Sequence, residues 1–212
     1  MGDLSRQDLE KMVRRVLTEI TAPPAPEPPA EPLAFVGPDG GHFEFKPEDL
    51  THLRGRRLVR KDHPIIVWRG RLDAFCARLL EVQVLAVKEG RPDLAEELEE
   101  VLDFCRRLLK SEFQGLEVED FHLLGLSPRD LRERSHNPAR FFGRPHMLMS
   151  YKMGPLPVAL NALRAGIREV ETAAVAAQNH GLILALNRLS SLFYIMTYRY
   201  LPENFQPEGA GI

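Results

Sequence analysis

The sequence has only two cysteines among its 212 residues, and no apolar run approaches the length of a membrane span. Two cysteines are too few for a disulfide scaffold or a cysteine-rich zinc site. A helix that crosses a bilayer needs about 20 apolar residues, so no membrane partner is expected. Neither sign of charge dominates, because 28 basic and 30 acidic side chains leave a net charge of −2. The net charge of the protein is therefore too small to attract nucleic acid.

The composition is that of an ordinary globular protein. Hydrophobic residues make up 44% of the chain and charged residues 27%, which is enough for one domain with a buried core. The first residues (MGDLSRQDLEKM) lack the apolar region of a signal peptide, so secretion is not expected. We therefore expect a cytoplasmic protein with one main domain.

Proline is concentrated in one short stretch. Six of the 17 prolines lie within residues 22–32, a composition typical of a semi-rigid extended linker. In front of it, Leu9, Val13, Val16 and Ile20 are spaced 4, 3 and 4 apart, as on one face of an amphipathic helix. The sequence thus predicts a targeting or docking helix in residues 1–21, a linker in residues 22–34 and the main domain in residues 35–212.

The main domain shows mostly helical periodicity. Apolar residues recur at spacings of three and four in four long segments, which begin near Trp68, Leu94, Leu156 and Leu182. Turn residues 38–41 (PDGG) predict a small hairpin, and short helices are expected around residues 48–53 and 128–134. Strand-like alternation is confined to Phe43–Phe45. The pattern predicts an all-α fold, an antiparallel bundle of four to five helices.

Polar residues line the flank of the third long segment. Asn161, Arg164, Arg168 and Glu171 are spaced 3, 4 and 3 apart, which places them within about 80° of one another, beside the apolar stripe. Two guanidinium groups on such a flank suit a polyphosphate or a carboxylate partner. The alternative is a solvated ladder of charges.

Two further positions are candidates for polar contacts between helices. In the last segment, Asn187, Ser191 and Tyr194 share one face and could also be a hydrogen-bond set that fixes the helix register. Asp73 directly follows the core residue Leu72 and needs a cationic partner if it is partly buried. Arg164 and Arg168 are candidates for that partner.

Together these places resemble a known family. Gly70–Asp73 (GRLD), Arg164–Glu171 (RAGIREVE) and Asn187–Ser190 (NRLS) resemble motifs of cobalamin adenosyltransferases of the propanediol-utilisation type. The resemblance is closer to the ethanolamine-utilisation branch and its microcompartment relatives. Motifs of that branch recur here in the same order, at Leu50–Leu53, Leu131–Pro138, Arg168–Ala174 and Ala185–Ser191. The resemblance covers about residues 47–200, and the ordered set is more specific than any single motif.

The resemblance implies an ATP:cob(I)alamin adenosyltransferase that makes adenosylcobalamin and triphosphate from cob(I)alamin and ATP with Mg²⁺. Arg168 would contact the phosphates, and Glu171 would orient it or help to organise Mg²⁺. Asn187 would hydrogen-bond the nucleotide, and Arg188 would add charge near the phosphates. Asp73 and Arg164 would form a salt bridge across a subunit interface. The resemblance also implies a homo-oligomer, with a trimer favoured.

The sequence departs from the family in its phosphate-binding segment. It lacks the Gly-Asp-x-Gly stretch of the propanediol type, and the nearest substitute is the basic stretch 54–61 (RGRRLVRK). Arg57 and Lys61 within it are therefore candidate phosphate contacts. The alternatives are a solvated basic loop or a weak nucleic-acid patch, which the net charge disfavours.

A second departure concerns metal and aromatic residues. The His and Cys-Cys-x-x-Cys cluster of the ethanolamine type is absent, and Cys76 and Cys105 fall at core positions, so no structural metal is expected. Phe141 and Phe142 precede the arginine segment, where the family places apolar groups beneath the corrin, and His146 falls near the family's aromatic position. Two adjacent phenylalanines could equally be one core and one surface residue.

A short amphipathic helix on a proline-rich spacer is the layout of peptides that direct enzymes into bacterial microcompartments. We therefore expect residues 4–20 to bind a shell protein or a B12-dependent enzyme, and the protein to reside in the microcompartment lumen. Alternatively, the helix could pack back on its own domain. The chain could also be a non-catalytic helical bundle that docks microcompartment enzymes or shell proteins.

Overall fold

The computed structural model describes residues 34–118 and 120–205, together with the isolated positions 7, 10, 11 and 14. The chain divides into two units, Met1–Ala34 and Phe35–Ile212, and each is considered by itself. The targeting helix predicted in residues 1–21 and the linker predicted in residues 22–34 lie almost entirely outside the described residues.

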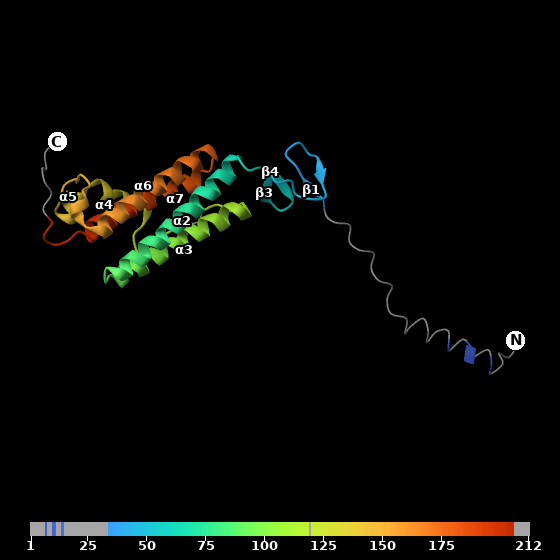
Figure 1. Ribbon diagram of the computed structural model, residues 1–212, viewed down its shortest axis with the longest axis horizontal. Coiled ribbons are helices and arrows are strands. Elements are labelled where there is room, and N and C mark those ends of the chain that lie inside the picture. The colour runs from blue at the N-terminus through green and yellow to red at the C-terminus, as the bar shows by residue number, and fades with distance from the viewer. Residues whose placement is uncertain (1–6, 8–9, 12–13, 15–33, 119, 206–212) are drawn as a thin grey trace. The chain divides into compact units, whose positions relative to one another are not determined.

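A small mixed sheet opens this unit, so the all-α prediction holds only in part: the described chain is mostly helical but not purely so (Figure 1). Its four strands are β1 (Phe35–Val36), β2 (His42–Phe43), β3 (Leu50–Arg54) and β4 (Arg57–Arg60), in the order β2-β1-β4-β3. The predicted hairpin is confirmed as the antiparallel pair β1–β2. The helix predicted over residues 48–53 is wrong, because this segment is strand β3, paired antiparallel with β4.

The sheet forms because the basic stretch carries a buried apolar pair. Leu58 and Val59 in β4 are 0% and 6% exposed, whereas their neighbours Arg57 and Arg60 are exposed. Gly55, with φ of 54°, supplies the left-handed residue in the tight turn between β3 and β4. β1 joins β4 in parallel at Val36 and Arg57. The basic stretch is thus strand and turn rather than a loop.

Four long helices follow the sheet, as the periodicity predicts. They are α2 (Pro64–Lys88), α3 (Pro92–Gln114), α6 (Pro155–Ala176) and α7 (His180–Arg199). Proline occupies the first turn of the first three, where its missing N–H costs nothing. Helix α7 is capped instead by Asn179, whose side chain accepts from the backbone N–H of Leu182.

The long helices pack in the order α3, α2, α6 and α7, each against the next. Their facing stripes form one core, and the six predicted positions of α2 are all buried: Trp68, Leu72, Phe75, Leu79, Val82 and Ala86. The end of α7 meets the start of α3, where Arg199 and Tyr200 both hydrogen-bond Glu97. Among the described helices, none is long and apolar enough to cross a membrane.

Shorter helices cover one side of α7. Helix α4 (Pro128–His136) confirms the helix predicted over residues 128–134, and it packs on α7. A capping box at Ser127 and Asp130 starts it. Helix α5 (Pro138–Phe142) and the 3₁₀ turn η1 (Tyr151–Met153) follow, and the chain between them returns to the start of α6. These segments enclose the polar flank of α6 and α7.

A buried ion pair connects the sheet to the helices. Glu112 of α3 is 1% exposed, and its carboxylate accepts two hydrogen bonds from Arg69 of α2, at 2.7 and 3.2 Å. The same guanidinium donates to the backbone carbonyls of His52 and Leu53 in β3. Arg54 donates to the backbone carbonyl of Glu112 at 2.8 Å. One buried carboxylate therefore joins α2, α3 and β3.

Candidate functional site

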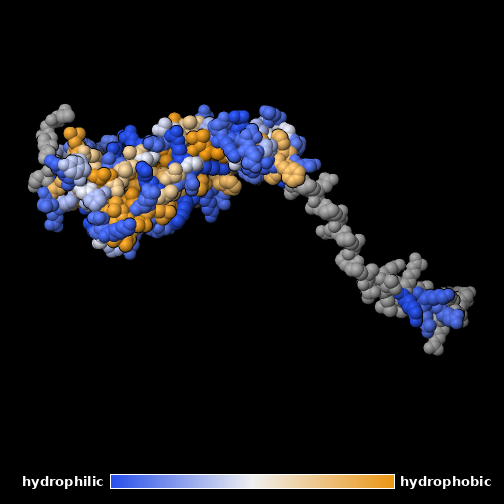
Figure 2. Space-filling view, viewed as in Figure 1, coloured by the Kyte–Doolittle hydropathy of each residue, from blue (hydrophilic) through white to orange (hydrophobic). Residues whose placement is uncertain are grey.

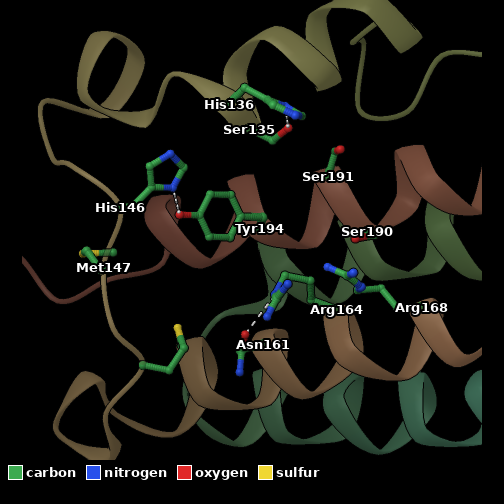
Figure 3. Close-up of a pocket in the computed structure, with 11 residues that line it drawn as sticks. Ser135, His136, His146, Met147, Asn161, Arg164, Arg168, Ser190, Ser191 and Tyr194 are labelled. Atoms are coloured by element: carbon green, nitrogen blue, oxygen red, sulfur yellow. Dashed lines mark hydrogen bonds between the residues drawn. The ribbon is translucent and has the colours of Figure 1, made fainter. Parts of the chain in front are cut away.

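A cavity of about 330 Å³ lies between α4, α6, α7 and the segment that precedes η1 (Figure 3). Its lining is polar on the helices and richer in sulfur and aromatic groups on the connecting segment. Helix α6 contributes Asn161, Arg164 and Arg168; helix α7 contributes Ser190, Ser191 and Tyr194; α4 contributes Ser135 and His136; the connecting segment contributes His146, Met147 and Met149.

The arginines of α6 face α7 across this cavity (Figure 3). Arg164 donates from Nε to Oδ1 of Asn161 at 3.0 Å, and its guanidinium lies 6.0 Å from the ring centroid of Tyr194. Among the described residues, the Arg168 side chain has no hydrogen-bond or ion-pair partner. Its donors are therefore available to an anionic ligand.

One turn farther along α6, a second polar cluster continues the site. Asn187 donates to the Glu171 carboxylate at 2.9 Å, and Arg188 donates to the Asn187 side-chain oxygen at 2.7 Å. Arg188 is 8% exposed, and its Nε has no hydrogen-bond partner among the described residues. Burial and the guanidinium of Arg132 lower the pKa of Arg188, while Glu171 opposes the shift. A buried cation with an unpaired donor favours an anion beside it.

The other end of the cavity holds a chain of hydrogen bonds between aromatic side chains. Nδ1 of His146 lies 2.7 Å from the Tyr194 hydroxyl, which lies 2.9 Å from the Tyr198 hydroxyl. Tyr198 in turn donates to the backbone carbonyl of Pro145 at 2.9 Å. Burial and the Tyr194 hydroxyl raise the pKa of Tyr198, so its hydroxyl keeps its proton at neutral pH.

Comparison with known proteins identifies the family that shares these motifs. Residues 45–200 match the sequence model of the cobalamin adenosyltransferase family. The chain belongs to the cobalamin adenosyltransferase family. It is 32% identical over 161 residues to proteins named corrinoid adenosyltransferase EutT in Escherichia coli strains K12 and CFT073, and 28% identical to that of Salmonella typhimurium LT2. The resemblance found in the ordered motifs is confirmed.

The match to these curated relatives is partial on both sides. It covers 71% of this chain and 58% of each relative, so the chain spans somewhat more than half the length of the relatives it matches. No solved structure matches the chain.

The structure brings five of the predicted site residues together. Arg164 and Arg168 line the cavity, and Glu171, Asn187 and Arg188 form the adjoining hydrogen-bonded cluster. Helical periodicity accounts for this, because α6 and α7 pack together along the flank that carries them. The polar flanks of α6 and α7 therefore converge in space.

Four predicted residues lie elsewhere. Asp73 is exposed on α2, in a groove with Cys76 and residues of α3, and forms no ion pair with Arg164 within the described chain. Arg57 and Lys61 are exposed in and after β4, and neither lines the cavity. Phe141 packs against the guanidinium groups of two arginines, and is 36% exposed.

The second phenylalanine, Phe142, does not line the cavity but supports its wall. Its ring stacks on Tyr198 with 5.1 Å between centroids. Of the two adjacent phenylalanines, Phe142 is thus packed and Phe141 lies at the surface, as the alternative interpretation predicted. Cys105 is buried as predicted, whereas Cys76 is only half-buried. Among the described residues, no three His, Cys, Asp or Glu side chains cluster as a metal site would require.

Sequence reasoning missed several residues of the cavity. Ser135 and His136 come from α4, and Arg132 of the same helix affects Arg188. The motif at Leu131–Pro138 contains all three, so it carried a usable signal. Met147 and Met149 lie in an irregular segment, where no periodicity indicates which side chains point inward.

Proposed function

We propose that this protein is an ATP:corrinoid adenosyltransferase, which transfers the adenosyl group of ATP to cob(I)alamin and releases triphosphate. The observation that carries the proposal is the convergence of three guanidinium groups and one carboxylate along α6 and α7. Arg164 and Arg168 line one cavity, Glu171 and Arg188 belong to the neighbouring hydrogen-bonded cluster, and all four lie within the residues that match the family.

In this reaction cobalt supplies the electron pair of the new cobalt–carbon bond, while the bond between the adenosyl carbon and the triphosphate oxygen breaks. Negative charge therefore builds on the leaving triphosphate. The protein's task is to position two large ligands and to stabilise that charge. Arg168 suits the second task, because its guanidinium donors have no competing partner among the described residues.

The neighbouring cluster supports the nucleotide. Glu171 holds the Asn187 amide by one hydrogen bond, and Asn187 holds Arg188 by another. Glu171 is also the carboxylate that would contact Mg²⁺ carried by ATP. Mg²⁺ typically binds one or two carboxylates besides phosphates and waters, so a single glutamate fits an ion that arrives with its nucleotide.

The size of the cavity supports an oligomeric enzyme. About 330 Å³ is near the lower limit for one small-molecule site, and ATP and a corrinoid cannot both fit within it. A second copy of the chain would supply the remaining walls. An apolar stripe suited to that contact lies on the outer face of α2, where Leu80, Val84 and Val87 are 47%, 55% and 60% exposed. Figure 2 shows hydrophobic surface over this part of the molecule.

We expect Asp73 and Arg164 to pair between copies of the chain in a homo-oligomer, with a trimer favoured by the family resemblance. Asp73→Arg should dissociate the oligomer, because a partly buried pair that loses one partner costs about 3–5 kcal/mol. Light scattering after gel filtration measures this. Combining Asp73→Arg with Arg164→Asp should restore assembly, and Asp62→Arg, at an exposed carboxylate after β4, is the matched control. Intact oligomers in the single variant would refute the pairing.

The experiment that tests the proposed activity follows the absorbance of chemically reduced cobalamin, in the dark and without oxygen. Adding ATP and Mg²⁺ with the protein should remove the cob(I)alamin absorbance. Omitting ATP or the protein should leave it unchanged. A protein that binds neither ATP nor cobalamin in direct titrations would refute the proposed function.

We further propose that residues 4–20 direct the enzyme into a bacterial microcompartment by binding a shell protein or a B12-dependent enzyme. The family match begins at residue 45, so this amphipathic segment and its proline-rich linker lie outside the matched domain. Residues 1–32 fused to a fluorescent protein should concentrate at empty shells in cells that make them. Val13→Asp with Val16→Asp should abolish this by charging the apolar stripe. Diffuse fluorescence of the unaltered fusion would contradict the proposal.

A further inference from the structure

We propose that the neutral ring of His146 presents Nε2 as a hydrogen-bond acceptor to the ligand of the cavity, and that a relay through Tyr194 and Tyr198 fixes the hydrogen of that ring on Nδ1. Nε2 would accept a hydrogen bond from an N–H or O–H group of the substrate. His146 is thus a positioning residue for the reaction. Which substrate it contacts rests on the proposed function, but the form of its ring does not.

The relay determines where the protons lie. Three contacts join His146, Tyr194, Tyr198 and the Pro145 carbonyl, at 2.7, 2.9 and 2.9 Å. Each contact needs one hydrogen, and the carbonyl can only accept. Tyr198 uses its hydrogen on the carbonyl, so Tyr194 must donate to Tyr198. The Tyr194 oxygen can then only accept from His146, which places a hydrogen on Nδ1.

A neutral imidazole carries one hydrogen, so Nε2 keeps its lone pair. Among the described residues, no group hydrogen-bonds this nitrogen, and it lies on the side of the ring that points away from Tyr194 (Figure 3). The ring is also held in orientation, because it stacks on Tyr194 with 5.9 Å between centroids. Phe142 in turn supports Tyr198, a residue of the relay, by stacking on its ring.

The relay gives the cavity an acceptor at the end where it otherwise has aromatic and sulfur groups. Arg164 and Arg168 on α6 can only donate, so they suit the anionic part of a ligand. His146 suits a neutral donor on the same or the second ligand. Ribose hydroxyls and the adenine amino group of ATP are such donors, and so are the carboxamide side chains of a corrinoid. Both substrates therefore offer N–H or O–H donors to His146, and the experiments below distinguish which of the two it binds.

The first test reads the ring directly. Long-range ¹H–¹⁵N spectra of the free protein, recorded at a pH at which the ring is neutral, should show His146 with hydrogen on Nδ1 and a pyridine-like Nε2. Its signals are identified by their loss in His146→Gln. Tyr194→Phe removes the acceptor and should shift His146 toward a mixture of both forms. His136 is the internal control, because its Nδ1 lies 2.9 Å from the Arg132 carbonyl and does not depend on Tyr194. Hydrogen on Nε2 of His146 in the unaltered protein would overturn the proposal.

The second test compares two replacements of different reach. His146→Asn keeps an N–H near the position of Nδ1 but has nothing at Nε2, whereas His146→Gln can place an amide oxygen near Nε2. The asparagine variant should raise one KM about three- to tenfold, the size of one neutral hydrogen bond, and glutamine should restore most of it. A change in the KM for ATP assigns a nucleotide donor, and a change in the KM for cobalamin assigns a carboxamide.

The remaining outcomes separate the two proposals. If the enzyme is active and neither KM changes in His146→Asn, the positioning role is refuted while the proposed function stands. If the unaltered protein binds neither substrate, the proposed function fails, and substrate contact by His146 fails with it. The spectra still decide the form of the ring in that case, because they are recorded without substrate.

Discussion

Replacing Arg168 by alanine should lower kcat/KM for adenosyl transfer by at least 10²- to 10³-fold, with no loss of folding stability. That is about the effect of removing one donor that stabilises charge in a transition state. Arg168 faces the cavity, and its side chain has no partner among the described residues. Alanine at this position therefore leaves no carboxylate of the protein without its partner. The loss in rate should come entirely from the hydrogen bonds that Arg168 would donate to the bound triphosphate. Initial rates with reduced cobalamin and ATP measure it.

Two further variants make this result specific. Arg168→Lys keeps the charge but loses the planar fork, so its activity should fall between those of alanine and the unaltered enzyme. Arg91→Ala removes the same charge from the start of α3, where Arg91 pairs with Asp93 on the surface, and should leave the rate unchanged. A full rate in Arg168→Ala would mean that the family motif does not act on phosphate here. Arg188 is less suited to this test, because it is buried and bonded to Asn187.

The helical part of the fold and the α6–α7 part of the site could be predicted from the sequence for the same reason. A helix fixes the angle between residues, so spacing alone tells which side chains share a face. The stripe of α2 and the flank of α6 both follow this rule. Because α6 and α7 are adjacent in sequence and pack together, the two polar flanks could only meet in one way.

The other parts of the fold and of the site depend on contacts between distant residues, which no local sequence pattern encodes. Strands β1 and β2 have two residues each, too few to show alternation, and the cations around Leu58 and Val59 concealed β4. Helix α4 reaches α7 across more than 40 residues of chain, so helical spacing alone could not place Ser135 and His136 in the cavity, although the motif at Leu131–Pro138 contains both. Asp73 is exposed on α2, and helical spacing within one chain carries no information about contacts between copies of the chain.

The ion pair between Glu112 and Arg69 is another feature that the sequence indicates only in hindsight. The apolar stripe of α3 runs through Leu94, Leu98, Val101, Cys105 and Leu108. The next position in that spacing is Glu112, a carboxylate where a core residue belongs. It is buried because Arg69 supplies two hydrogen bonds and reaches β3 at the same time.

Glu112→Ala should therefore lower the free energy of unfolding by about 3–5 kcal/mol, the cost of leaving one partner of a buried ion pair uncompensated. Natural domains are stable by only about 5–15 kcal/mol, so the loss is a large share of the total. Urea unfolding measures it, and the fluorescence of Trp68, which is fully buried beside Arg69, reports the same region. Asp103→Ala removes an exposed carboxylate from the same helix and should cost no more than about 1 kcal/mol.

A double variant separates charge burial from packing. Arg69→Met together with Glu112→Ala leaves only the half-exposed Arg54 without the Glu112 carboxylate, so it should recover much of the stability lost in Glu112→Ala, as apolar replacements of buried ion pairs often do. Recovery would show that the penalty comes from the isolated guanidinium. Equal stability of Glu112→Ala and Asp103→Ala would contradict the role of Glu112 in joining the sheet to the helices. Since neither residue lines the cavity, adenosyl transfer per folded molecule should be unchanged at low temperature, which distinguishes this pair from Arg168.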